Sequence, residues 1–212
     1  MTALDEKTPV RPGDGTDLAV RPRLVLLTVV FTLLYAGVHV YWAVGGTWRV
    51  PVAARQDPGT VRAANWVVTA AMLVGAAWVP ALNHRAAGRV PAWALLVPLW
   101  CGGVVCVSHA VFGFVTKTLY LLGAHGAVDF PAAHGVDPAA LAHDHRLSAV
   151  RDLWLFEACF LVQGVLPALA ARQFVPTPAG RRGWSRSFVL GVAAVDAFGL
   201  LLSLGNTHVA LG

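Results

Sequence analysis

The sequence predicts an all-α transmembrane helical bundle of about five spans with its N-terminus in the cytoplasm. Of the 212 residues, 57% are hydrophobic and 13% are charged, whereas an average soluble domain carries about 25% charged residues. The apolar residues gather in five runs, each approaching the ~20 residues needed to cross a ~30 Å hydrocarbon core. Because the bilayer core holds no water, a helix is the structure that satisfies its own backbone there.

Five runs are therefore expected to span the membrane. The last is the shortest, and it contains Asp196 about 12 Å from its start, at 1.5 Å per residue. A long connection precedes the fourth run, and Asp137-Pro138 within it is typical of a helix N-cap followed by proline. The predicted spans are residues 24–46, 63–82, 92 to at least 115, 153–171 and 188–204.

The chain divides into a leader and a bundle. Residues 1–23 are rich in Pro, Gly and Asp, which predicts a disordered cytoplasmic leader. Residues 24–212 form the transmembrane bundle, with a long outer loop at 116–152. A secretory signal peptide would have a shorter leader and a shorter apolar stretch, so a true span is the favoured interpretation of the first run.

The cations set the predicted orientation. The chain has 14 Arg and 2 Lys and a net charge of +5, and ten of these cations lie in the leader or after the second and fourth runs. Because Arg and Lys favour cytoplasmic loops, the C-terminus is expected outside. The Arg-rich, Lys-poor composition is typical of a bacterium with a GC-rich genome, which predicts a multi-pass protein of the inner (plasma) membrane. No basic stripe with interleaved aromatic residues occurs, so no nucleic-acid partner is expected.

Several polar side chains reach one depth near the predicted outer face. Glu157 lies about 7 Å below the outer boundary, and His39 and His109 fall in the same layer. An ionisable group costs at least ~2.5–3.5 kcal/mol at the bilayer centre, so this layer is the candidate site, and we expect Glu157 to contact His39 or His109. The candidate ligand-binding residues are His39, Tyr41, Trp42, Asn65, His109, Glu157 and Asn206.

Helical spacing predicts which faces of the spans meet. Small and polar residues favour contacts between helices over contacts with lipid, and residues three and four apart share a helix face. We expect five such stripes to face one interior with its polar end open outward. They are Tyr35, His39, Trp42 and Gly46; Asn65, Thr69, Met72 and Ala76; Gly102, Cys106, His109 and Gly113; Glu157, Leu161, Gly164 and Ala168; and Asp196, Gly199, Ser203 and Asn206.

The cofactor is left unassigned. His39 and His109 lie at equal depth on two helices, which would suit a metal ion or a bis-histidine haem, but the favoured interpretation is a pair of interior histidines bonded to polar neighbours. In the outer loop, His143 and His145 are the candidates for metal ligation. Two ligands two residues apart do not define a metal site, so none is predicted.

Three classes of function remain open, and the residues alone do not say whether the protein is an enzyme. The leading hypothesis is a non-catalytic membrane protein, either an accessory subunit of another membrane protein or a binder of a lipophilic small molecule or lipid. The second is a membrane-embedded enzyme acting on a lipid-like substrate, with Glu157 as acid/base and His39 or His109 as its partner. The third is a small proton-coupled carrier using Glu157 and Asp196, although no inverted repeat is found.

The end of the first run carries a sequence motif. It reads His39-Val40-Tyr41-Trp42-Ala43-Val44-Gly45-Gly46 and resembles the His-x-Tyr-Trp-Ala-x-Gly-Gly stretch of domain-of-unknown-function family 3995, a family of small bacterial membrane proteins. The resemblance implies a four-helix membrane bundle with this stretch at its outer end, and it implies no reaction. The longer outer loop and the fifth run depart from the family's pattern.

Overall fold

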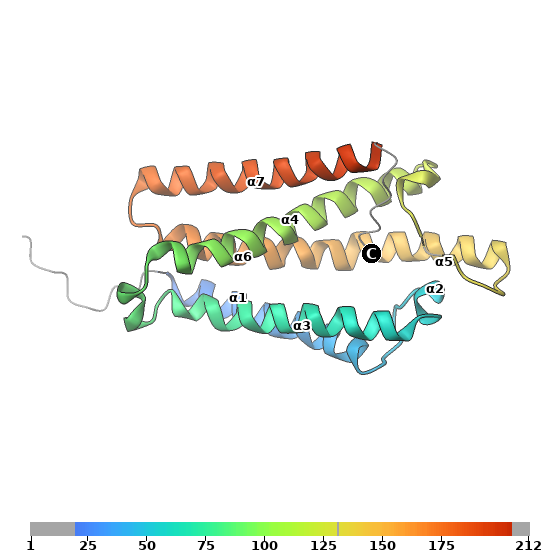
Figure 1. The fold of residues 1–212 in the computed structure, drawn as a ribbon, viewed down its shortest axis with the longest axis horizontal. Coiled ribbons are helices and arrows are strands. Elements are labelled where there is room, and N and C mark those ends of the chain that lie inside the picture. Colours follow the sequence, from blue (N-terminus) through green and yellow to red (C-terminus); the bar gives the residue numbers. More distant parts are fainter. Residues whose placement is uncertain (1–19, 131, 205–212) are drawn as a thin grey trace, which may run out of the picture.

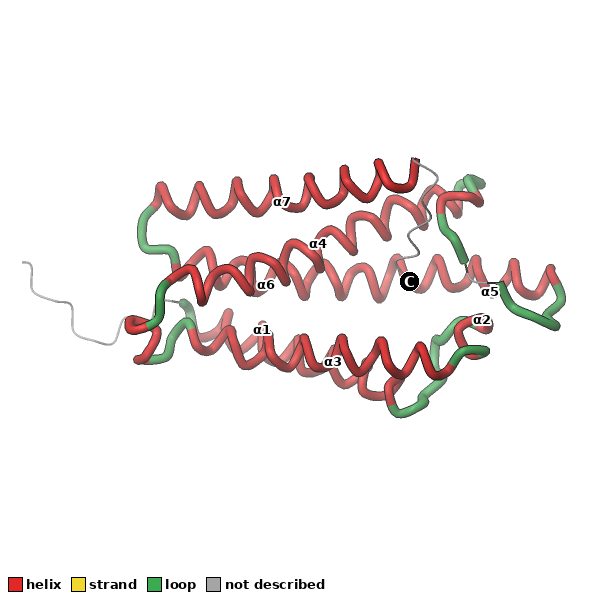
Figure 2. The backbone as a smooth tube through the Cα atoms, viewed as in Figure 1, coloured by secondary structure: helices red, strands yellow, loops and turns green. Residues whose placement is uncertain are grey.

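The computed structural model describes residues 20–130 and 132–204, so the leader before residue 20 and Asn206 lie outside it. Helices make up most of the described chain, and no strand occurs in it (Figures 1 and 2). A π-helical segment, Asp152–Phe156, joins two of the helices end to end. The helices are α1 (Pro22–Ala43), α2 (Val52–Arg55), α3 (Pro58–Ala81), α4 (Ala92–Leu121), α5 (Pro138–Arg151), α6 (Glu157–Phe174) and α7 (Pro178–Leu204).

Five helical segments are long and apolar enough to cross a membrane, which confirms the predicted bundle of five spans. The segment predicted to be shortest extends over Pro178–Leu201 and has ample length. The fourth is a continuous helix of 37 residues, Pro138–Phe174, or about 55 Å at 1.5 Å per residue. Its first part, α5, therefore extends beyond a ~30 Å core. The protein is a multi-pass integral membrane protein.

The spans associate in pairs. α1 packs mainly on α3, and α4 packs mainly on α6, while α7 lies on α4, so Figure 1 shows two paired layers with α7 above them. Glycine permits the closest contact: a Cβ on Gly164 would lie 2.7 Å from the carbonyl oxygen of Gly103. Small residues allow helix backbones to approach in this way in membranes.

Most of the predicted stripes face the interior, but two need correction. On α4, Gly102 faces open space, and its neighbour Gly103 makes the contact with α6. On α7, no residue of the most apolar stretch is buried, and Asp196 is only half-buried and lies near Ser108 of α4. Asp196 and Gly199 of the fifth stripe therefore lie beside α4 and do not face a common interior.

Side chains fasten both ends of the bundle. At the end where α1 begins, Asn83 bonds both backbone groups of Val20 at 2.8 Å. Within residues 116–152, predicted as a long outer loop, lie the last turns of α4 and all of α5. As expected, Asp137 caps α5 by accepting from Ala140, with Pro138 in the first turn. Asp144 of α5 then accepts from the backbone of Val52 at 3.0 Å and so ties α5 to α2.

Candidate functional site

The polar side chains of the predicted outer layer form two clusters. We call the first the cavity cluster: Tyr35, His39 and Asn65, from α1 and α3. We call the second the ion cluster: His109, Lys117, Asp152 and Glu157, from α4, the π-helical segment and α6. The division follows the pairing of α1 with α3 and of α4 with α6.

The cavity cluster centres on a buried histidine. His39 is only 6% exposed, and its Nδ1 lies 2.7 Å from Oδ1 of Asn65. The amide nitrogen of Asn65 donates to the carbonyl of Val61 at 2.7 Å. The rings of Tyr35 and Trp42 meet the His39 ring edge to face, with centroids 4.9 and 5.4 Å away. His39 is therefore fixed in position from several sides.

A cavity of about 250 Å³ opens beside this cluster. This is slightly smaller than the ~300–1,000 Å³ of typical ligand sites, so it suits a small molecule or one end of a larger one. Aromatic rings provide much of its apolar wall, and α2 with the chain before it borders the cavity. The lining residues are Tyr35, His39, Trp42, Arg49, Val50, Pro51, Ala54, Val61, Asn65, Asp152, Phe156 and Phe160.

Two buried polar atoms of the cavity lining lack partners. The hydroxyl of Tyr35 and Nε2 of His39 have no hydrogen-bond partner among the described residues, and so they do not bond to each other. Tyr35 is 5% exposed. Because an unmade hydrogen bond at a buried group costs ~1–3 kcal/mol, atoms of this kind beside a cavity indicate a place for a ligand or for water.

The ion cluster, by contrast, sets its charges against one another, although Oε2 of Glu157 is also buried without a hydrogen-bond partner among the described residues. Lys117 lies 3.1 Å from Asp152 and also bonds to Glu157, which is 1% exposed. Nε2 of His109 lies 3.7 Å from Oε2 of Glu157, which confirms the predicted contact with one of the two histidines. Two carboxylates thus share one ammonium group near the C-terminal end of α4.

Two backbone features shape the ion cluster. A Cβ at Gly113 would overlap the Glu157 carboxylate, so only glycine leaves room for this side chain against α4. The helix passes through the π-helical segment Asp152–Phe156 just before Glu157. Such segments occur frequently at functional sites, and this one places Asp152 at both the cavity and Lys117.

An aromatic ring fills the space between the clusters. Phe160 contacts the Tyr35 ring, with centroids 5.7 Å apart, and the His109 ring, with centroids 4.1 Å apart. His109 itself does not line the cavity, and its side chain is 46% exposed. The histidines that the sequence placed in one layer therefore belong to different clusters.

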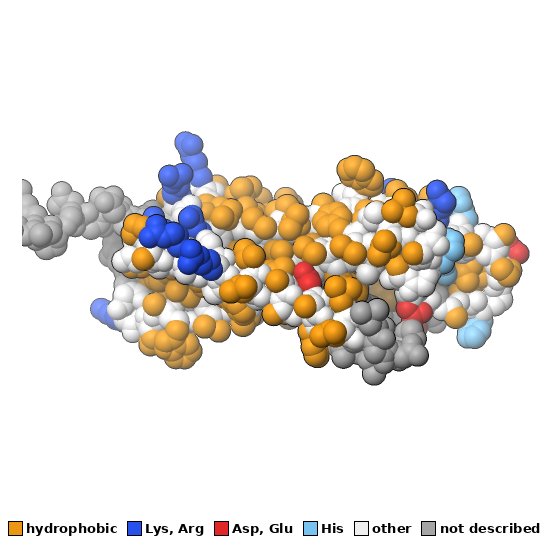
Figure 3. Space-filling model, turned by 90° about the horizontal axis from the view of Figure 1, so that it is seen from above, with side chains coloured by type: hydrophobic (Ala, Val, Ile, Leu, Met, Phe, Trp, Pro, Cys, Tyr) orange, Lys and Arg blue, Asp and Glu red, His pale blue; other side chains and the backbone are white. Residues whose placement is uncertain are grey.

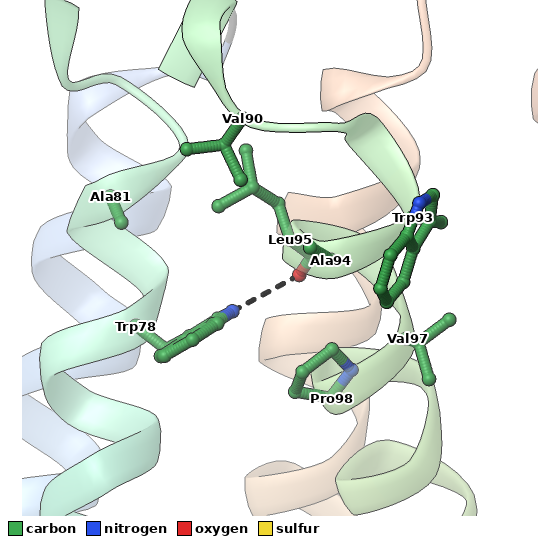
Figure 4. A pocket seen from close by; sticks show the side chains of 8 residues that line it. All are labelled: Trp78, Ala81, Val90, Trp93, Ala94, Leu95, Val97 and Pro98. Carbon is green, nitrogen blue, oxygen red and sulfur yellow. Dashed lines mark hydrogen bonds between the residues drawn. The ribbon is translucent and has the colours of Figure 1, made fainter. Parts of the chain in front are cut away.

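A second hollow, of about 330 Å³, lies near the opposite end of the bundle between α3 and the start of α4 (Figure 4). Trp78, Trp93 and Pro98 border it, and the Trp78 indole donates to the carbonyl of Leu95 at 3.2 Å. Its wall is apolar, so it offers no acid, base or ligating group. Although larger, it is therefore the weaker candidate for a specific site.

Comparison with protein families assigns the chain to a family. A family described as "Protein of unknown function (DUF3995)" matches residues 32–167, which is more than half of the chain. The protein belongs to the DUF3995 family. Both polar clusters of this DUF3995 member lie within the matched residues, whereas α7 lies beyond them. No curated protein and no solved structure matches the chain.

The fold gives distinct roles to the residues at the end of α1. His39 and Trp42 line the cavity, while Gly45 turns the chain at a φ of +101°, a conformation that glycine adopts readily. A Cβ at Gly46 would overlap the ring of Tyr41. Tyr41 does not line the cavity, and its hydroxyl accepts from the backbone of Trp48 at 3.3 Å. The motif thus combines cavity residues with the turn that follows them.

The remaining predicted site residues are dispersed. Asn206 lies outside the described residues. His143 and His145 belong to α5, and no group of three or more His, Cys, Asp or Glu side chains in the described chain is arranged for a metal ion. Lys117 and Asp152 were missed as site residues, because both lie in residues 116–152, which were predicted as a long outer loop. Helical spacing was the available signal, because Tyr35 lies one turn before His39 and Lys117 lies two turns after His109.

Proposed function

We propose that this protein binds a lipophilic small molecule or a lipid, and that its site is an outward-facing cavity lined by Tyr35, His39 and Asn65. The unpartnered atoms of Tyr35 and His39 beside a cavity of about 250 Å³ carry this proposal. Binding sites are typically apolar pockets with a few placed polar groups. The aromatic wall and the two free hydrogen-bonding atoms fit that description.

The other hypotheses have less support. An acid–base enzyme would need Glu157 in a cavity, and Glu157 does not line this one but bonds to Lys117. A proton-coupled carrier would need a polar route from Glu157 to Asp196, and Asp196 is only half-buried on α7, whose most apolar stretch has no buried residue. An accessory subunit without a ligand would be expected to pair its buried polar atoms. Unpartnered atoms at a cavity therefore favour ligand binding.

Filling the cavity tests the proposal. Ala54 lines it from the short helix α2, so Ala54→Phe should occupy the ligand's space, whereas Ala63→Phe on the exposed side of α3 should not. Unfolding temperatures would be measured in lipid nanodiscs with butylbenzene, 1-hexanol or 4-butylphenol. We expect at least one probe to raise the unfolding temperature saturably in the wild type and in Ala63→Phe but not in Ala54→Phe, since a ligand that binds only the folded state stabilises it. Equal shifts in all three proteins, or no shift in any, would refute the proposal.

The cavity end is proposed to face outward from the inner membrane of a bacterium. Figure 3 shows, on one face, Lys and Arg gathered mainly at the left end of the view and His side chains at the right end. Arg and Lys favour the cytoplasmic side. With the native cysteines replaced, Cys at His143 should react with a membrane-impermeant maleimide on spheroplasts, and Cys at Gly183 should react only after lysis. The reverse pattern would invert the orientation.

A further inference from the structure

The hydrogen bonds of Asn65 fix the tautomer of His39. The Asn65 amide nitrogen donates to the carbonyl of Val61 at 2.7 Å, so its oxygen is the atom that faces Nδ1 of His39 at 2.7 Å. If the Asn65 amide were flipped, its oxygen would face the carbonyl oxygen of Val61, and neither atom could donate a hydrogen. An amide oxygen only accepts, and therefore Nδ1 of His39 carries a hydrogen. In a neutral imidazole the other nitrogen is then an acceptor.

His39 and Tyr35, which both line the cavity, consequently carry complementary groups. Nε2 of His39 presents a lone pair, and the hydroxyl of Tyr35 can donate, with both atoms buried and unpartnered among the described residues. The two rings lie close together, with centroids 4.9 Å apart. A hydroxyl group satisfies both atoms, because its hydrogen goes to Nε2 and its oxygen accepts from Tyr35.

The charges around the cavity are already engaged. Asp152 pairs with Lys117 at 3.1 Å, and the exposed Arg49 guanidinium lies 5.1 Å from the ring centroid of Trp48. The wall near the two polar atoms is made of the rings of Trp42, Phe156 and Phe160. An uncharged hydroxyl on an apolar or aromatic body fits this environment better than a carboxylate or an ammonium group.

Resting on the proposed binding function, we infer that the ligand carries a hydroxyl group that donates to Nε2 of His39 and accepts from Tyr35. A free phenol or alcohol would supply it, and so would the hydroxyl of a lipid headgroup. Both sources share the same chemistry at the site. Tyr35 and His39 thereby determine which amphipathic molecules bind.

A matched ligand series tests the inference. Binding of 4-butylphenol, 4-butylanisole and butylbenzene would be measured in phosphatidylcholine nanodiscs. The ether cannot donate to His39, and we expect it to bind about tenfold more weakly than the phenol, as one lost hydrogen bond of ~1.4 kcal/mol corresponds to a factor of ten. Tyr35→Phe should weaken phenol binding by a similar factor. Tyr120→Phe, whose hydroxyl lies outside the cavity, should bind like the wild type.

The outcomes separate this inference from the proposed function. Equal binding of phenol, ether and hydrocarbon, all abolished by Ala54→Phe, would overturn the hydroxyl and leave the cavity as a binding site. If no member of the series binds, both the hydroxyl inference and the proposed binding function are overturned. Water would then be the partner of the Tyr35 hydroxyl and of His39 Nε2. When binding follows the expected order, phenol binding is compared between phosphatidylglycerol and phosphatidylcholine nanodiscs. Weaker binding in phosphatidylglycerol, whose headgroup hydroxyls compete for the site, assigns the hydroxyl to a lipid headgroup, and equal binding assigns it to a free molecule.

Discussion

The cavity cluster and the ion cluster occupy the same end of the bundle and are built in opposite ways. In the ion cluster, Lys117 bridges Asp152 and Glu157, so one ammonium group serves two carboxylates. In the cavity cluster, the Asn65–His39 bond orients a ring whose second nitrogen has no partner in the described chain. The ionisable residue most expensive to bury thus stabilises the bundle, and the less charged cluster is left available for a ligand.

The difference cautions against equating a buried charge with a functional site. Burying Glu157 beside Lys117 is expected to hold α4 and the fourth span together. Groups that are paired within the protein have little left to offer another molecule, whereas an unpartnered buried atom gains from binding one. Variants of the two clusters should therefore affect different properties.

Removal of the shared cation should have the largest effect. Lys117→Met leaves two carboxylates near each other without their cation, and breaking a buried pair on one side costs about 3–5 kcal/mol. Unfolding by sodium dodecyl sulfate in mixed micelles would measure the loss. The double variant Lys117→Met/Glu157→Leu should recover part of it, because the most deeply buried charge is then gone. A single variant as stable as the wild type would contradict the structural role of the cluster.

A smaller loss is expected from crowding the same carboxylate. Gly113→Ala puts a methyl group where the Glu157 carboxylate lies, and the required shift should cost about 1–3 kcal/mol. Gly102→Ala on the same helix meets nothing within 4 Å and should be neutral or slightly stabilising, since Ala is the better helix former. Equal losses of stability for the two variants in the micelle titration would contradict the specific role of Gly113 beside Glu157.

In the cavity cluster, Asn65→Ala should affect both stability and binding. It removes the acceptor of His39 Nδ1, and an unmet buried donor costs about 1–3 kcal/mol. The imidazole is then free to change tautomer, so phenol should lose its advantage over its methyl ether. Binding measurements in nanodiscs, alongside the unfolding titration, would detect both changes. An intact preference for phenol would show that Asn65 does not set the tautomer.

Tyr35→Phe should change stability least. Its hydroxyl has no partner among the described residues, so in the absence of ligand its removal should leave the free energy of unfolding unchanged or raise it slightly. The same variant should lose affinity for 4-butylphenol. A clear loss of stability without ligand would mean that the hydroxyl makes a bond within the protein.

The sequence predicted much of this arrangement for physical reasons. Apolar runs of sufficient length gave the five spans, and helical spacing put Tyr35, His39 and Trp42 on one buried face. Depth along each helix put His39, His109 and Glu157 in one layer, but depth does not say which helices are neighbours. The pairing of α1 with α3 and of α4 with α6 divided that layer. The sequence left the end of α4 open beyond Val115, and the contact of Lys117 with Glu157 depends on this pairing of helices, which composition does not show.

The most direct test is an experimental structure with 4-butylphenol bound, at a resolution that shows ordered water. The account predicts density for the probe in the cavity, within hydrogen-bond distance of the Tyr35 hydroxyl and His39 Nε2, with Lys117 still joined to Asp152 and Glu157. Density for the probe beside Glu157, or a cavity that holds water alone, would contradict it.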